Sequence, residues 1–115
     1  MNHVGLYGKI VEELVTLEED DEGSQVNFTV SNLRRVGADD RELTYVPVRT
    51  YDWLAEVVSM NAKKGDFVLV EGKLATLDGE EGSALGIEAN RVMFLDQRRL
   101  AFPETSWQDR SRNRG

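Results

Sequence analysis

The spacing of apolar residues changes along this chain, and the change restricts the folds that the chain can adopt. Strict alternation of apolar and polar residues, or a short apolar run, marks five segments as strands, whereas Asp52 to Met60 has helical spacing. The five predicted strands cover residues 4–16, 26–31, 43–49, 67–74 and 84–95. The predicted order is therefore three strands, one helix and two strands, without internal repeats.

This order is typical of an OB-fold, an all-β five-stranded Greek-key barrel with one helix between strands 3 and 4. We expect the barrel over residues 1–96 and a flexible, Arg-containing tail over residues 97–115, where apolar periodicity stops. Gly8 is expected at a bend or bulge where the first strand changes partners. Pro47 has no N–H to donate, so it is expected at an edge or a bulge.

Length and composition exclude several function classes. A chain of 115 residues without cysteine forms one domain without disulfides or thiolate metal sites. His3 is the only histidine, and the sequence holds no GxxxxGK[ST] or GxSxG motif, so we expect neither a cofactor, nor a metal, nor enzymatic activity. Because no long apolar run or signal-peptide pattern is present, we expect a soluble cytoplasmic protein.

The charge is negative overall but unevenly distributed. The formal net charge is −7, which argues against a general attraction to nucleic acid or anionic membranes. Residues 1–97 hold 9 Lys and Arg against 19 Asp and Glu, whereas residues 98–115 hold 5 Arg against 2 acids. Five consecutive acids over residues 18–22 predict a solvated loop, because such a run repels itself.

Four segments carry a family resemblance, in order and at matching spacing. They are Met1 to Ile10, Asn27 to Val30, Leu54 to Glu56, and Lys64 to Leu74 with the sequence KGDFVLVEGKL. Together they resemble the bacterial-type single-stranded DNA-binding protein family. The resemblance implies an OB-fold that binds single-stranded DNA with little sequence preference during DNA replication, recombination and repair. It further implies a homo-oligomer, most often a tetramer with a dimer as the alternative, a nucleoid-associated cytoplasmic location and no enzymatic activity.

The strand over residues 43–49 carries the best candidates for base stacking. Binding without sequence readout needs flat side chains for bases and cations for phosphates. By alternation, Tyr45 and Arg49 share the face opposite Val46 and Val48, and Tyr51 follows at the junction with the helix. By the resemblance, Tyr45 and Tyr51 fall on stacking positions of the family. The alternative is that both tyrosines only cover barrel edges.

Cations on this strand, in the connection before it and near the loop between the last two strands are the candidate phosphate contacts, and each also has a simpler explanation as an ordinary solvated charge. The candidates are Arg34, Arg35, Arg41, Arg49 and Lys73, with Lys9 and Arg91 as weaker ones. Helical spacing predicts that Trp53 packs against the protein, and Phe28 and Phe67 are predicted core residues.

Departures from the family pattern predict weaker binding and leave a second function open. Stacking residues are missing from the connection at Arg34 and from the turn at Asp78 to Glu81, and the chain ends in a basic rather than an acidic segment. Recruitment of replication or repair proteins through an acidic tail is therefore not expected. The alternative function is an OB-fold adaptor, similar to primosomal proteins, which acts mainly through protein partners.

Overall fold

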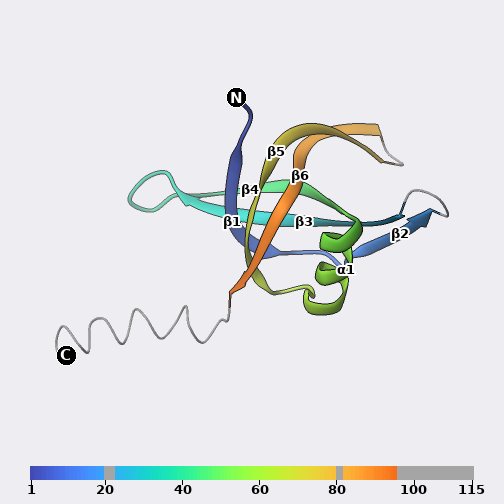
Figure 1. The fold of residues 1–115 in the computed structure, drawn as a ribbon. Coiled ribbons are helices and arrows are strands. Elements are labelled where there is room, and N and C mark those ends of the chain that lie inside the picture. The colour runs from blue at the N-terminus through green and yellow to red at the C-terminus, as the bar shows by residue number, and fades with distance from the viewer. Residues whose placement is uncertain (20–22, 80–81, 96–115) are drawn as a thin grey trace.

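The computed structural model describes residues 1–19, 23–79 and 82–95, which form six strands and one helix (Figure 1). Asp20 to Glu22 of the acidic run and the tail predicted over residues 97–115 lie outside the described residues. The elements are β1 (Val4–Ile10), β2 (Val15–Glu19), β3 (Gly23–Arg35), β4 (Arg41–Tyr51), α1 (Asp52–Asn61), β5 (Phe67–Gly79) and β6 (Gly82–Leu95).

Five of these strands close into a barrel. The sheet order is β1-β5-β6-β4-β3-β2, and additional β1–β3 pairs close the ring. All neighbours are antiparallel except β4 and β6, which run parallel through Val48↔Ile87 and Arg49↔Glu88. This confirms the predicted five-stranded barrel with its helix before the last two strands. Pro47 does not lie at the predicted edge or bulge: it pairs with Thr29 inside β4, an inner strand whose register with β3 has no shift. The missing N–H is tolerated because the β4–β6 pairs begin only at the next residue.

The first strand changes partners where the sequence predicts it. β1 pairs with β5 from Val4 to Lys9, and with β3 at Lys9 and Ile10. A Cβ on Gly8 would collide with the backbone carbonyl of Ser31 and the side chain of Val30. Only glycine allows β1 and β3 to approach this closely, so Gly8 closes the barrel.

The prediction that the first strand continues to about residue 16 is wrong. β1 ends at Ile10, whose N–H donates to the Asp66 carbonyl, and the next strand, β2, begins at Val15. β2 pairs only with β3, outside the barrel, and it includes Glu18 and Glu19. These two acids were expected in a solvated loop, but the cross-strand ladder with Ser24 and Gly23 extends over them.

The connection predicted between Arg34 and Arg41 is shorter in the structure. β3 runs to Arg35 and β4 starts at Arg41, so the two strands form a ribbon that projects beyond the barrel, on the side of Figure 1 opposite α1. Cross-strand pairs Leu33↔Leu43 and Arg34↔Glu42 hold its end together. Both sides of the ribbon are exposed here, so no alternation of buried apolar and exposed polar residues marks these parts of the two strands.

Side chains from every barrel strand and from α1 fill the core. The helix covers the barrel through Ala55 and Val58, which are fully buried, and Thr50 satisfies its buried hydroxyl by donating to the Val26 carbonyl at 3.1 Å. The buried hydrophobic residues are Ile10, Val26, Phe28, Val30, Val48, Ala55, Val58, Val68, Val70, Ile87 and Ala89.

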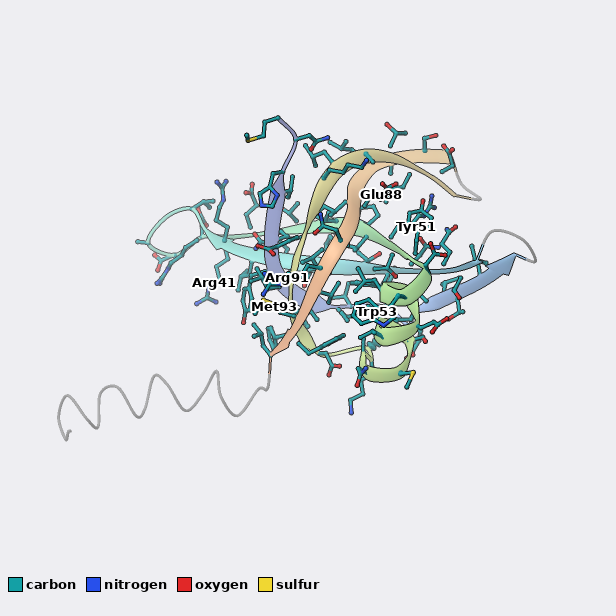
Figure 2. All side chains as sticks on the ribbon, viewed as in Figure 1. Arg41, Tyr51, Trp53, Glu88, Arg91 and Met93 are labelled. Atoms are coloured by element: carbon teal, nitrogen blue, oxygen red, sulfur yellow. The ribbon has the colours of Figure 1, made fainter. Side chains whose placement is uncertain are left out.

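Two of the three aromatic packing predictions are wrong. Phe28 is buried as predicted, but Phe67 is only half-buried and stacks on Tyr7 with ring centroids 6.0 Å apart. Trp53 leaves 73% of its surface exposed. The apolar residues of α1 lie on more than one side of the helix. Because Ala55 and Val58 form the buried side, Trp53 lies on the side that faces solvent (Figure 2).

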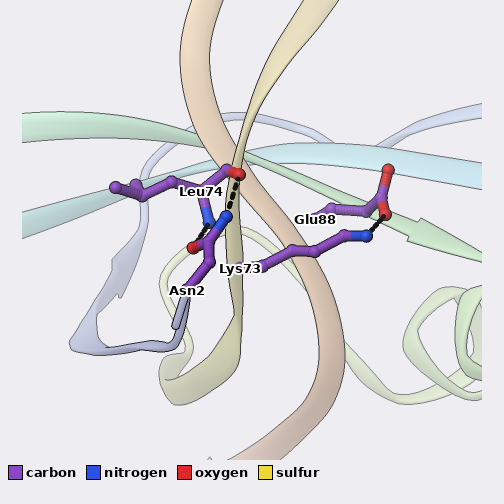
Figure 3. Close-up of polar contacts among 4 residues, drawn as sticks. All are labelled: Asn2, Lys73, Leu74 and Glu88. Atoms are coloured by element: carbon purple, nitrogen blue, oxygen red, sulfur yellow. Dashed lines mark hydrogen bonds and ion pairs between the residues drawn. The ribbon is translucent and has the colours of Figure 1, made fainter.

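Hydrogen bonds from Asn2 fix the N-terminal segment to β5 (Figure 3). The Asn2 Nδ2 donates to the Leu74 carbonyl at 3.0 Å, and the Leu74 N–H donates to Asn2 Oδ1 at 2.8 Å. The side chain thus continues the β1–β5 ladder beyond Val4. A register shift between Glu71 and Gly72 lets β5 bend from the barrel into the β5–β6 hairpin.

Candidate nucleic-acid interface

One side of the β3–β4 ribbon combines cations and flat side chains. The residues with odd numbers share this side, because side chains alternate along each strand while Val26, Phe28 and Val48 point into the core. We call it the β3–β4 outer face. It consists of Gln25, Asn27, Thr29, Ser31, Leu33 and Arg35 on β3 with Arg41, Leu43, Tyr45, Pro47, Arg49 and Tyr51 on β4. None of these residues is acidic, but the carboxylate of Glu12 reaches the face and accepts from Thr29 Oγ1 at 2.9 Å.

The two tyrosines are accessible on this face. Tyr45 leaves 59% and Tyr51 39% of its surface exposed, and both face outward from β4 as the alternation predicted. Leu33 and Leu43 extend the flat apolar surface toward the end of the ribbon. Rings with this exposure can accept nucleobases of any identity, since every base offers a π-face.

Arg49 is held in place by neutral partners. Its Nε donates to Asn27 Oδ1 at 2.8 Å, and its Nη2 donates to the Asp78 carbonyl at 2.6 Å. Neither acceptor is charged, so these bonds set the orientation of the guanidinium without an ion pair that would compete with a phosphate. An oriented cation loses little rotamer freedom when it binds a phosphate. The second bond also joins β4 to the β5–β6 hairpin.

Arg35 and Arg41 form the cationic end of the β3–β4 outer face. They lie opposite each other in the ladder and line a shallow pocket together with Leu33. Within the part of the chain that the structure describes, no carboxylate forms an ion pair with either. Like charges placed directly opposite each other destabilise a ribbon, and an anion between them relieves that repulsion. The pair therefore forms a suitable position for a phosphate.

The other predicted phosphate contacts lie elsewhere and are paired. Arg34 lies on the opposite side of the ribbon and forms an ion pair with Glu42 at 2.7 Å. Lys73 lies on β5 and pairs with Glu88 at 3.5 Å (Figure 3). The structure thus brings Arg35, Arg41 and Arg49 together with Tyr45 and Tyr51, and separates Arg34 and Lys73 from them.

The weaker candidates lie on another surface. Lys9 is placed over the ring of Phe67, 5.9 Å from its centroid, and Arg91 pairs with Glu71 at 3.4 Å. Both belong to the outer side of the β1, β5 and β6 strands, where Figure 2 shows Arg91 beside Met93.

Sequence reasoning missed Asn27, Leu33 and Leu43 as members of the site. Asn27 was predicted only as part of a family segment, because its pairing with Arg49 depends on a strand register that one sequence does not reveal. Alternation along β3 could have placed Asn27 and Leu33 on the outward side, and alternation along β4 could have added Leu43 to the site.

Other kinds of site are not apparent in residues 1–19, 23–79 and 82–95. Within these ranges, no three His, Cys, Asp or Glu side chains come together as a metal site. The helix α1, with ten residues, is too short and not apolar enough to cross a membrane.

Known proteins share both the fold and the sequence pattern of this chain. A small single-stranded DNA-binding protein from Streptomyces coelicolor superposes with a TM-score of 0.72 at 19% identity, covering 84% of this chain and 94% of that one. The Plasmodium falciparum SSB, solved in complex with ssDNA, gives a TM-score of 0.72 at 18% identity over 84% and 96% of the two chains. These likenesses confirm the predicted OB-fold.

The sequence comparisons lead to the family. Single-stranded DNA-binding protein 2 of Chlorobaculum tepidum is 28% identical over 109 residues, which cover 86% of this chain and 74% of that protein. The model of the single-strand binding protein family matches residues 1–95, the whole barrel. The resemblance inferred from four short segments is thereby confirmed, and the chain belongs to the single-strand binding protein family.

Proposed function

We propose that this protein binds single-stranded DNA with little sequence preference along the β3–β4 outer face. Bases stack on Tyr45 and Tyr51, and phosphates contact Arg49, Arg35 and Arg41. The observation that carries the proposal is the combination of three arginines and two exposed tyrosines on one face, where none of the arginines forms an ion pair among the described residues. Membership of the single-strand binding protein family supports it.

Arg34 and Lys73 have a secondary part in this proposal. Each is more than half exposed at the side chain and remains accessible to a passing phosphate. Each is also paired with a carboxylate, so a phosphate must compete with Glu42 or Glu88 for the cation. The net contribution of such exposed pairs is small, and we expect these two residues to matter less than Arg49.

The net charge of −7 does not exclude this function, because none of the twelve residues of the β3–β4 outer face is acidic, although the Glu12 carboxylate reaches this face and accepts from Thr29 Oγ1 at 2.9 Å. At about 0.15 M salt, charges farther apart than roughly 8 Å are largely screened from each other. A phosphate beside Arg35, Arg41 or Arg49 therefore interacts mainly with that arginine, whereas the Glu12 carboxylate disfavours a phosphate beside Thr29. In this role the protein covers exposed strands in the cytoplasm during replication, recombination and repair, and it acts by binding rather than by catalysis.

We further propose that the protein assembles into a homo-oligomer through β1. The outer edge of β1 from Val4 to Gly8 has no strand partner among the described residues, although the Tyr7 carbonyl accepts from Asn32 Nδ2 at 2.8 Å. An edge without a strand partner can pair with a second copy. Beside this edge, the outer side of β1, β5 and β6 carries a partly exposed apolar row. It consists of Tyr7, Phe67, Leu69, Met93 and Leu95.

Edge pairing would produce a dimer, and packing of two apolar rows would join dimers into a tetramer. Light scattering measures the mass directly: we expect four chains, and Leu69→Asp should reduce the assembly to two. A wild-type mass of one chain would contradict the use of either surface.

Titration of fluorescent oligo-dT at low and moderate salt tests the DNA-binding proposal. The double variant Tyr45→Ala with Arg49→Ala should abolish binding, whereas Lys64→Gln, which removes one positive charge after α1, should bind like the unaltered chain. If the unaltered chain fails to bind oligo-dT even at low salt, the DNA-binding proposal is wrong and the adaptor function takes its place.

A further inference from the structure

An exposed apolar stripe on α1 has no partner among the described residues. Trp53 is 73% and Met60 81% exposed, and half-buried Val57 lies between them at the spacing that aligns residues on one side of a helix. We call these three residues the α1 stripe. Side chains of this size are rarely left open together without a binding partner.

Acidic residues border the stripe at the start of the helix. Asp52 and Glu56 are exposed on α1. The carboxylate of Asp52 lies close to Gly23, the first residue of β3. Lys63 and Lys64 follow at the other end of the helix. The surface is therefore apolar in the middle and acidic at the helix N-terminus, which suits a segment with apolar residues followed by cations.

The chain itself contains such a segment. Residues 96–115 hold five arginines against three acids, whereas residues 1–95 hold nine Lys and Arg against eighteen acids. Leu100 and Phe102 come early in this segment, and Arg110, Arg112 and Arg114 come at its end. Arg98 and Arg99 precede these apolar residues. From Leu100 onward, the order of apolar and then basic residues matches the stripe and its acidic end, read from the C-terminus of α1 to its N-terminus.

The point where this segment begins also suits the stripe. Leu95, the last described residue, pairs with Phe67, and α1 ends at Asn61, so at most about 20 Å of chain separates the helix end from Phe67. The twenty residues after Leu95 span up to about 66 Å when extended, whereas α1 is about 15 Å long. The segment is therefore long enough to reach the whole stripe.

We propose that residues 96–115 bind the α1 stripe of the same chain, with Leu100 and Phe102 on Met60 and Trp53 and the terminal arginines on Asp52 and Glu56. A tethered segment has an effective concentration near the millimolar range, so contacts with a Kd of about 1 mM would keep it bound for half of the time. Arg side chains can also lie over the indole of Trp53.

Fluorescence of Trp53 in the full chain tests the proposal. The sequence has two tryptophans, so Trp107→Phe leaves Trp53 as the only indole. Replacing Arg110, Arg112 and Arg114 with Ser in that background should shift the Trp53 emission to longer wavelength and raise its quenching by acrylamide about two-fold. Glu56→Lys should do the same, whereas Asp39→Lys, at the far end of the β3–β4 ribbon, is the matched control and should not.

Equal quenching in all of these variants would overturn the proposal. Protection of Trp53 that appears only after oligo-dT is added would also overturn it, because the stripe would then belong to the DNA path. This readout does not depend on DNA binding, so it is independent of the proposed function.

Cross-linking provides a second test, because the chain contains no cysteine. Met60→Cys with Leu100→Cys should form a disulfide within one chain, and Leu33→Cys with Leu100→Cys is the control pair that should remain reduced under the same conditions. A disulfide that forms only between two chains, or equally in both pairs, would contradict binding within one chain.

Discussion

Arg35 and Arg41 lie directly opposite each other in the last pair of the β3–β4 ladder, and no carboxylate among the described residues pairs with either. The next pair toward the barrel, Arg34↔Glu42, has opposite charges and an ion pair at 2.7 Å. The same ribbon thus has a neutralised side and a cationic side. The difference between these sides separates a structural role for Arg34 from a binding role for Arg35 and Arg41.

The first prediction concerns this difference. Arg41→Gln should weaken oligo-dT binding about five-fold and reduce the salt dependence by about 0.7 in the slope of log K against log salt, the value for one phosphate on a single strand. It should raise the melting temperature slightly, because a like-charge contact disappears. Arg34→Gln should have the smaller effect on binding and lower the melting temperature. The reverse ranking of the two variants in the titration would contradict the assignment.

The second prediction concerns the stacking rings. Tyr45→Ala should cost about 1–3 kcal/mol of binding, roughly five- to 150-fold in Kd, because a base loses its aromatic partner. Tyr45→Phe should keep most of the affinity, since the ring remains. Tyr51→Ala should act in the same direction but less, because Tyr51 is less exposed. Equal affinity of Tyr45→Ala and the unaltered chain would show that the ring only covers the barrel edge.

The third prediction concerns the orientation of Arg49. Arg49→Lys keeps the charge, but an ammonium cannot donate in the planar geometry that joins Asn27 to the Asp78 carbonyl. We expect an affinity loss of about five-fold with an unchanged salt slope, because the number of neutralised phosphates stays the same. Asn27→Ala should reproduce this result, as it removes the acceptor and leaves the arginine. If Arg49→Lys binds as tightly as the unaltered chain at every salt concentration, orientation has no role.

The sequence predicted those features of the fold and site that depend on local periodicity. Alternation along β4 placed Tyr45 and Arg49 on the outward side, and Gly8 marked the change of partners in β1. The apolar periodicity of a sequence does not determine the register between paired strands, so the pairing of Arg34 with Glu42 was not predicted. Helical periodicity also wrongly predicted that Trp53 packs against the protein, because α1 has apolar residues on both its buried and its exposed sides.

The last prediction concerns closure of the barrel and compares two glycines of β1. Gly8→Ala should destabilise the fold by about 1–3 kcal/mol, because its Cβ would collide with the carbonyl of Ser31 where β1 meets β3. Gly5→Ala is the matched control in the same strand: nothing lies within 4 Å of its Cβ position, and alanine should stabilise the strand by about 0.5–1 kcal/mol.

Thermal unfolding followed by circular dichroism measures both changes, and about 1 kcal/mol corresponds to roughly 4–8 °C in the melting temperature of a domain of this size. The two variants should therefore move in opposite directions. Because β1 also carries the open edge proposed for assembly, each variant should be compared at equal chain concentration, since assembly raises apparent stability by mass action. A Gly8→Ala protein as stable as Gly5→Ala would mean that β1 and β3 do not approach closely at this point.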